Sequence, residues 1–379
     1  MVFLHALSLV IGLGLAVVVV DSAVRTFVVP RGTVSRLTRL VFSLSRRFFE
    51  LFAKPSRTYR QRDRVMALYA PLTLLALPVV WLIILLVGFA AMFWGWEGGA
   101  VGTSVRLSGS SLLTLGFERP AHPVSVALVL SEATLGLAVL ALLISYLPTM
   151  YGTFSRREAM VTQLSVRAGT PPAAVEFLER AHLSGFLLDL DRFFEQWEGW
   201  FEEVEETHTS LGSLSFFRSP NPDRSWITAA GCVLDTASLR LAILDIPYSA
   251  QPAVCIRSGY LALRAIAAIF DQPFDPDPPP DGVISIAREE FDDVRRRLAA
   301  SGLPLKADVE QAWRDFQGWR VNYDEPLLRL SALFMAPYAP WSSDRSLRRQ
   351  LPRVMRRSPR RVGDSKGSST TSFRGREPE

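Results

Sequence analysis

The feature that most constrains the fold is an uncharged run of 32 residues, Val65–Trp96. About 20 apolar residues are enough to cross the ~30 Å hydrocarbon core of a bilayer as a helix. A core helix in a soluble protein does not stay apolar on every face for this length. The run therefore predicts a membrane-spanning helix, in which Pro71 and Pro78 can introduce kinks and Trp94 and Trp96 suit an interface.

Two further runs share this character. The segment 1–28 opens with twenty residues that include no Asp, Glu, Lys or Arg, and Ala133–Ser155 is also uncharged. A cleaved signal peptide is the alternative for the first run, but a basic start and a clear small-residue cleavage site are both missing. We predict an all-α membrane protein with three transmembrane helices, the last of which is followed by Arg156 and Arg157.

A basic segment, residues 29–64, separates the first two runs. Eleven Arg or Lys but only two acids lie between Arg25 and Arg64. Apolar residues recur there at helical spacing: Leu37, Leu40, Val41, Leu44, Phe48 and Leu51. This pattern predicts an amphipathic helix on an anionic leaflet, and the positive-inside rule then places the segment in the cytoplasm and the N-terminus outside. A solvated charged linker is the alternative, and it leaves the orientation unchanged.

The composition changes at Arg156, where charged residues return and helical patterns continue to about residue 341. We predict a helical cytosolic domain at 156–341, broken by proline-rich stretches at 219–222 and 273–282. Thr170, followed by two prolines, is the expected N-cap of an early helix. Residues 342–379 hold eleven Arg or Lys against four acids. They predict a disordered basic tail that meets anionic lipid.

The segment between the second and third spans, residues 98–123, differs from both neighbours. Four hydroxyl residues give it a polar approach: Ser108, Ser110, Ser111 and Thr114. It is long enough to enter and leave one leaflet as a short helix and an extended return. Non-helical backbone at membrane depth is tolerated only where it is buried in protein or lines water. We therefore predict a re-entrant pore loop within a pore-type domain at 65–155; a short extracellular connector is the alternative.

This arrangement resembles the two-helix pore unit of a prokaryotic potassium-channel-like family with helical C-terminal domains. The filter of potassium channels reads T-V-G-Y-G-D or a T-x-G-F-G variant, and four residues match its first positions: Thr114, Leu115, Gly116 and Phe117. Gly136 falls near the usual hinge glycine, and the E-T-H-T-S motif at Glu206–Ser210 extends the resemblance. The resemblance implies a homotetramer whose backbone carbonyls replace the hydration shell of a monovalent cation, with K⁺ favoured.

The match ends at the next two positions. Glu118 replaces the second filter glycine, and Arg119 replaces the acid that follows it. A filter backbone alternates in handedness, and a non-glycine residue at positive φ costs about 1–2 kcal/mol. In a fourfold assembly the two residues would form rings of opposite charge, which cancel if paired, whereas Glu118 alone would concentrate cations. The expected cation channel therefore has an alternative: a non-conducting, channel-derived scaffold or sensor acting through its cytosolic domain.

Glu132 is the one acidic residue within the third span. An intramembrane carboxylate costs on the order of 2.5–3.5 kcal/mol and usually faces a cavity or a partner. Glu132 lies four residues before Gly136 and therefore on the same helix face. We predict that it faces protein or water; a place at the outer interface is the alternative.

The sequence motifs give little support for an enzymatic or a metal-dependent function. Glu179/His182 and Glu205/His208 have E-x-x-H spacing, but a dinuclear helical site needs two further Glu residues from other helices. Asp271–Asp281 resembles a calcium loop in composition only, because its prolines disrupt the required turn. With no catalytic triad spacing, we predict no enzyme, no metal and no cofactor beyond the permeant cation. The basic residues are concentrated in the linker and tail, so nucleic-acid binding is not expected.

Overall fold

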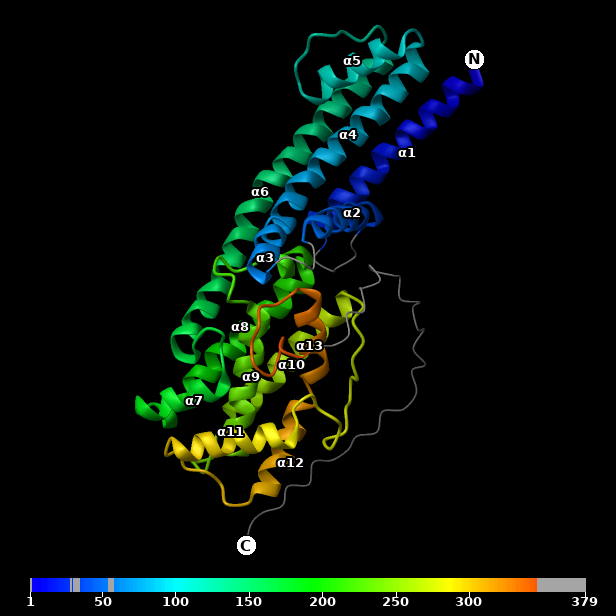
Figure 1. Ribbon diagram of the computed structural model, residues 1–379. Helices are drawn as coiled ribbons and strands as arrows, with labels where there is room; N and C mark the ends of the chain where they lie inside the picture. The colour runs from blue at the N-terminus through cyan, green and yellow to red at the C-terminus, as the bar shows by residue number, and fades with distance from the viewer. Residues whose placement is uncertain (1, 28, 30–34, 54–57, 346–379) are drawn as a thin grey trace.

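The protein is represented by a computed structural model that describes residues 2–27, 29, 35–53 and 58–345 (Figure 1). All regular elements in these ranges are helices, which confirms the predicted all-α class. The α-helices are α1 (Val2–Phe27), α2 (Arg36–Phe52), α3 (Tyr59–Ala67), α4 (Tyr69–Glu97), α5 (Val101–Leu112), α6 (Pro123–Ala168), α7 (Ala174–Leu183), α8 (Leu190–Ser210), α9 (Trp226–Ala242), α10 (Gln251–Ile269), α11 (Arg288–Ala300), α12 (Val309–Arg320) and α13 (Asp324–Leu333). The 3₁₀ turns are η1 (Leu187–Asp189) and η2 (Gly212–Phe216).

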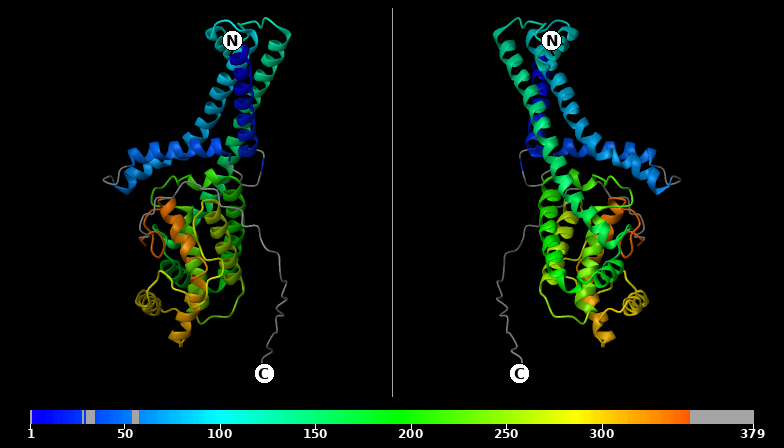
Figure 2. Two further views of the ribbon diagram at one scale, coloured as in Figure 1. Left: turned by 90° about the vertical axis from the view of Figure 1, so that its right-hand side faces the viewer. Right: turned by 90° about the vertical axis from the view of Figure 1, so that its left-hand side faces the viewer.

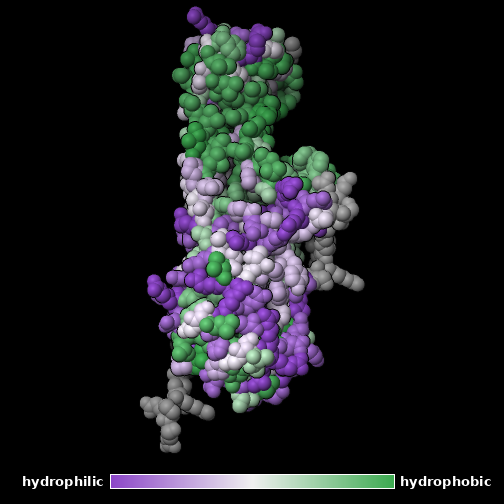
Figure 3. Space-filling view, turned by 60° about the vertical axis from the view of Figure 1, so that its left-hand side comes forward, coloured by the Kyte–Doolittle hydropathy of each residue, from purple (hydrophilic) through white to green (hydrophobic). Residues whose placement is uncertain are grey.

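The helices form two parts. The stalk consists of α1, α4, α5 and the first half of α6, and the helical domain consists of α7–α13 with the two 3₁₀ turns (Figure 1). Between them α2 and α3 extend sideways beneath the stalk (Figure 2). The stalk surface is largely apolar, whereas the helical domain is covered mostly by polar side chains (Figure 3). This segregation follows the uncharged runs of the sequence.

Four described helical segments are long and apolar enough to cross a membrane: α1, the α3–α4 segment Tyr59–Glu97, α6 and α10. The first three build the stalk (Figure 1). In contrast, α10 lies in the helical domain, where Cys255, Ile256 and Leu263 belong to the same core as buried residues of α8 and α9. Length and composition thus fit a membrane protein, with one candidate more than the three predicted spans.

Small residues bring α1 and α4 close together. A side chain at Gly12 would lie 2.3 Å from the carbonyl oxygen of Gly88. Helices in lipid associate through such close contact, since acyl chains are as apolar as the helices themselves. Farther along, Trp81 Nε1 donates a 3.1 Å hydrogen bond to Ser22 Oγ, so the polar atoms of this interface are also paired.

One helix joins the two parts. α6 runs for 46 residues without a break and includes Pro148 in its interior. The domain boundary predicted between residues 155 and 156 therefore falls inside a continuous helix. α6 therefore connects the stalk and the helical domain as one covalently continuous helix.

The basic segment forms two helices rather than a linker without structure. α2 begins at Ser35, whose side chain accepts a 3.0 Å hydrogen bond from the backbone of Thr38. Four apolar side chains lie exposed along one side of it: Leu40, Leu44, Phe48 and Leu51. The predicted amphipathic helix is therefore present, with an apolar face available to a membrane surface.

The helical domain has one core, to which α7–α13 all contribute. The sequence correctly predicted most of its helices, but not the start of α7. Thr170 is not its N-cap: α7 begins at Ala174 with Ala173 as N-cap, and residues 170–172 form a turn. The predicted breaks at 219–222 and 273–282 lie outside helices. The tail predicted to be disordered begins too early at residue 342, because Ser342 is buried and Arg345 pairs with Glu290. The rest of it, from 346 onward, lies outside the described residues.

Candidate functional site

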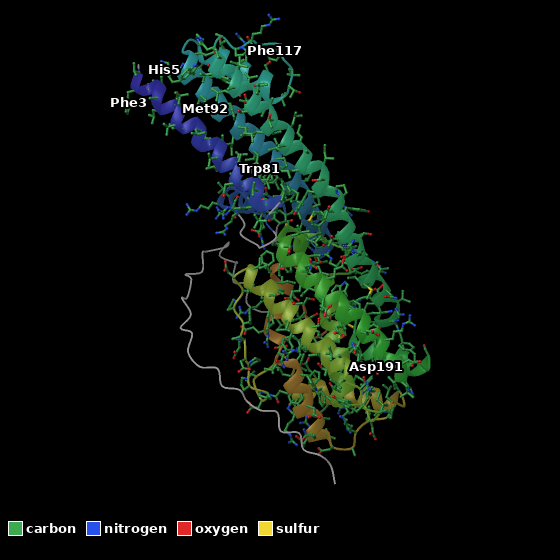
Figure 4. All side chains as sticks on the ribbon, turned by 180° about the vertical axis from the view of Figure 1, so that it is seen from behind. Phe3, His5, Trp81, Met92, Phe117 and Asp191 are labelled. Carbon is green, nitrogen blue, oxygen red and sulfur yellow. The ribbon has the colours of Figure 1, made fainter. Side chains whose placement is uncertain are left out.

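α5 lies between α4 and α6 at the end of the stalk farthest from the helical domain. Figure 4 shows Phe117 and His5 at this end, and Asp191 in the helical domain toward the other end of the molecule. Four hydroxyl side chains of α5 are buried: Ser104, Ser108, Ser110 and Ser111. Leu107 and Leu112 join the stalk core. The short helix predicted within residues 98–123 is therefore present and is anchored on its polar side.

A left-handed residue ends α5. Thr114 has φ of 55°, and the N–H groups of Thr114 and Leu115 donate to the carbonyl oxygens of Ser111 and Ser110 at 3.0 and 2.8 Å. This pair of bonds is a Schellman motif, whose left-handed position is usually glycine. A residue with a Cβ costs about 1–2 kcal/mol there. Thr114, the first residue of the predicted filter, is thus held in a strained conformation.

Left-handed backbone alternates along the matched segment. Gly116 has φ of 72°, two residues after Thr114, while Leu115 and Phe117 do not have positive φ. The side chains of Leu115 and Phe117 are 62% and 61% exposed. Thr114–Phe117 is therefore an exposed return segment in the single chain, with the alternating handedness expected of a filter backbone.

Glu118 has an ionic partner, but this is Arg106 rather than the neighbouring Arg119. Arg106 Nε donates a 2.8 Å hydrogen bond to the Glu118 carboxylate, and Glu118 N donates to Ser110 Oγ at 3.2 Å. Glu118 is not at positive φ, so the strain expected at the second glycine position does not arise. Arg119 is exposed. The ion pair ties the end of the return segment back to α5.

Glu132 is completely buried, with its carboxylate against α5. It accepts hydrogen bonds from Ser108 Oγ at 2.5 Å and from Ser111 Oγ. No basic side chain pairs with it in the part of the chain that is described. Ser108 Oγ also lies 2.9 Å from the Leu86 carbonyl oxygen, and a hydroxyl has only one proton to donate. Neutral donors therefore join α6 to α5, and this burial agrees with the predicted orientation toward protein.

Gly136 lies one turn farther along the same face of α6. A Cβ at Gly136 would lie 2.6 Å from the carbonyl oxygen of Leu112, the last residue of α5. Any larger side chain would push the end of α5 away from α6. The predicted hinge glycine thus has an immediate packing role, because it sets the position from which the return segment starts.

The residues considered for metal binding are not brought together. Glu179 accepts hydrogen bonds of 2.8 and 2.6 Å from Arg297, which hold the pKa of its carboxyl below the usual value. His208 instead lies at Arg157, and His182 has no part in such a group. No set of three His, Cys, Asp or Glu side chains suited to a metal ion occurs among the described residues.

A buried arginine beneath the stalk was not predicted. Arg157 of α6 donates to the carbonyl oxygens of Leu214 and Phe217 at 3.0 and 2.8 Å and pairs with Glu158. Its Nη1 lies 3.1 Å from His208 Nε2, and burial together with the Arg157 charge holds the pKa of His208 well below its usual value. The neutral imidazole therefore accepts the hydrogen bond. In the sequence Arg157 reads as an ordinary flanking charge after a membrane span.

No family model, no curated protein and no solved structure matches the chain. The candidate site is therefore defined by its own geometry: a strained, exposed return segment on a short buried helix that two apolar helices enclose.

Proposed function

We propose that the protein is a potassium-channel-like integral membrane protein that conducts cations through a tetrameric pore with an altered filter, T-L-G-F-E. The observation that carries this proposal is the alternation of left-handed Thr114 and Gly116 after a short helix between α4 and α6. Such alternation turns successive carbonyls toward one side, where they can replace ion hydration. The permeant ion is a monovalent cation, K⁺ by resemblance, and no other cofactor is required.

The exposed apolar side chains of the return segment support assembly with further copies. Leu115 and Phe117 are more than half exposed, as is Leu113 immediately before them. Each chain contributes a single return segment, so a closed pore requires several chains around one axis, and the resemblance favours four. Assembly would cover these side chains and bring the carbonyls of Thr114–Phe117 together.

The proposed topology has α1, α4 and α6 as three spans and α5 with Thr114–Phe117 as a re-entrant loop. The N-terminus lies outside, and the helical domain lies in the cytoplasm of a cell-membrane protein, as the basic segment favours. α10 stays in the helical domain, since its buried residues belong to that core. The exposed apolar face of α2 and the basic residues of the linker and tail then meet anionic lipid.

A second candidate is a channel-derived scaffold or sensor that does not conduct. The observation in its favour is the Arg106–Glu118 ion pair, which places both signs of charge where a potassium filter has glycine and a free acid. Pairing removes the field that would attract cations at the pore mouth. This candidate keeps the same fold and topology and differs only in the pore.

Potassium flux from liposomes that contain the purified protein tests the proposal, with a Glu118→Gly variant measured beside the wild type. The proposal predicts flux from the wild type and a change in its rate in the variant. Flux from the variant alone favours the scaffold. Absence of flux from both, or chemical cross-linking that yields only monomers and dimers, contradicts the channel.

A further inference from the structure

A cavity lies where the stalk, α2 and the helical domain meet; we call it the junction cavity. Its interior, the space open to the centre of a water molecule, measures about 120 Å³, and it is open to solvent on one side. Its walls come from the end of α1, the first two-thirds of α2, parts of α4 and α6, the end of α8 with η2, and the ends of α10 and α13. An apolar cavity of about 150 Å³ can hold a molecule the size of benzene, so the interior has room for a head group or a short part of a chain.

One wall is basic. Arg25, Arg39 and Arg46 line the cavity, and no Asp or Glu is among its lining residues. Arg25 donates from Nε to Asp21. Arg46 donates from Nε to Glu50 and from one Nη to the Leu333 carbonyl oxygen. A guanidinium has five N–H donors, so both retain donors for a further acceptor. This wall suits a phosphate or carboxylate group, which a guanidinium binds through paired hydrogen bonds.

The rest of the lining combines hydroxyls with apolar surface. Thr209, Ser210 and Ser213 contribute hydroxyls from the end of α8 and from η2. Apolar side chains make most of the lining, among them Phe42 of α2 and Phe270 at the end of α10. A small hydrophilic anion would leave this apolar surface without a partner, whereas an acyl chain would cover it.

We propose that the junction cavity binds an amphiphilic anion, a molecule with a phosphate or carboxylate head and an acyl chain, as in an anionic lipid. The head is bound by the arginines of α1 and α2, and the chain lies on the apolar side chains of the lining. The E-T-H-T-S motif, Glu206–Ser210, thereby acquires a role, because its last two residues line the cavity. This site lies between helices and is distinct from the attraction of the exposed α2 face to a membrane surface.

The site also connects α2 with α6. The lining segment that ends α8 and forms η2 is fixed to α6 by Arg157, which donates to the carbonyl oxygens of Leu214 and Phe217. A molecule held between this segment and α2 therefore bridges α6 to the membrane-surface helix. The binding itself does not depend on conduction, so it is measured separately from flux.

The experiment compares dodecyl phosphate with inorganic phosphate as probes on the purified full-length protein, by native mass spectrometry. Ser210→Trp fills the cavity and keeps every arginine; Arg39→Gln with Arg46→Gln removes charge from the basic wall. The matched control, Arg36→Gln with Arg47→Gln, removes the same charge from exposed positions of α2 that do not line the cavity.

We expect dodecyl phosphate to bind the wild type and the control within about twofold of each other. Both cavity variants should bind it about tenfold or more weakly, since each loses charged hydrogen bonds or the space for the chain. A melting temperature measured for each variant shows that it is folded. Reconstitution in phosphatidylcholine vesicles with and without phosphatidylglycerol then shows whether a bilayer lipid supplies the same chemistry. We expect the wild type and the control to retain phosphatidylglycerol, and the two cavity variants not to retain it.

Three results would overturn the inference. Unchanged binding in folded Ser210→Trp would place the probe on the surface of α2. Equal binding of inorganic and dodecyl phosphate would mean that the arginines hold an ion without its chain. Equal losses of binding in the control and in the cavity variants would show that binding depends on the net charge of the protein and not on the cavity. None of these results bears on potassium flux, so they leave the proposed channel untouched.

Discussion

Glu132 in the stalk and Arg320 in the helical domain are both completely buried, yet they are stabilised in different ways. Among the described residues, Glu132 has only the hydroxyls of Ser108 and Ser111 as partners. Arg320 lies between the carboxylates of Asp235 and Asp324 and also donates to the Trp341 carbonyl. The stalk thus surrounds a titratable group with neutral donors, whereas the domain surrounds a fixed charge with opposite charges.

This difference predicts how each region responds when one partner is removed. Arginine stays charged in proteins, so its loss leaves two buried carboxylates without a counter-charge. The serines around Glu132 have an alternative acceptor, since Ser108 Oγ lies 2.9 Å and Ser111 Oγ 3.1 Å from helical carbonyl oxygens. We therefore expect the removal of one partner to destabilise the helical domain strongly and the stalk only slightly.

The largest effect is expected for Arg320→Met. Asp235 and Asp324 would remain buried and unpaired, which should lower the free energy of unfolding of the helical domain by about 3–5 kcal/mol. Urea denaturation followed by tryptophan fluorescence measures this. The matched control is Arg288→Met, which breaks exposed pairs with Asp292 and Glu310 and should cost about 1 kcal/mol or less. Equal costs in the two variants would remove the basis of the comparison.

The stability of the helical domain is expected to depend on pH through His208. Its pKa is well below the usual value in the fold because of burial and Arg157, whereas the unfolded chain takes up a proton near pH 6.5. Protonation therefore favours the unfolded state, and stability should fall by up to about 1.4 kcal/mol per pH unit as pH drops below about 6.5, and stay level above it. Melting temperatures between pH 7 and pH 5 check this. His208→Phe should lose this part of the slope; an unchanged slope would assign it to other groups.

A smaller effect is expected for Glu132→Ala. The hydroxyls of Ser108 and Ser111 can turn to helical carbonyls, so the loss in stability should be about 1–2 kcal/mol. Glu132→Gln, which retains an acceptor, should cost about half as much or less. Thermal melting in detergent micelles compares the two. A loss as large as that of Arg320→Met would show that Glu132 is indispensable to the stalk and not one of several acceptors.

The smallest effect, and the only stabilising one, is expected for Thr114→Gly. Glycine removes the Cβ strain at φ of 55° at the C-terminal cap of α5, which should stabilise the stalk by about 0.5–1 kcal/mol. The melting temperature in micelles should rise by a few degrees. Leu113→Gly, one residue earlier and not left-handed, is the matched control and should not stabilise. A fall in both variants would contradict a strained Thr114.

The sequence predicted helices more successfully than contacts. The uncharged runs and the spacing of Leu40, Leu44 and Phe48 predicted the stalk helices and the amphipathic α2, because such patterns depend only on neighbours along the chain. α7 starts four residues beyond the expected N-cap at Thr170, a boundary that local preferences determine poorly.

Those patterns do not predict contacts between residues that lie far apart in the sequence. Glu132 was expected to face protein or water, and it is buried, but its partners on α5 follow from tertiary packing, 21 and 24 residues away. The Asp235–Arg320 pair spans 85 residues and has no sequence signal beyond the i,i+4 spacing of Arg320 and Asp324. The same holds for the Arg106–Glu118 pair, where the neighbouring Arg119 was the obvious partner from sequence.

The claim that Thr114–Phe117 lines a cation pathway can be tested most directly with Thr114→Cys. Both native cysteines, Cys232 and Cys255, are buried, so a membrane-impermeant thiol reagent should leave the wild type unmodified. Potassium flux is measured in liposomes before and after the reagent is added. We predict that the variant conducts and that the reagent blocks it, while wild-type flux is unchanged. Flux that persists after Thr114→Cys has been modified would contradict the account.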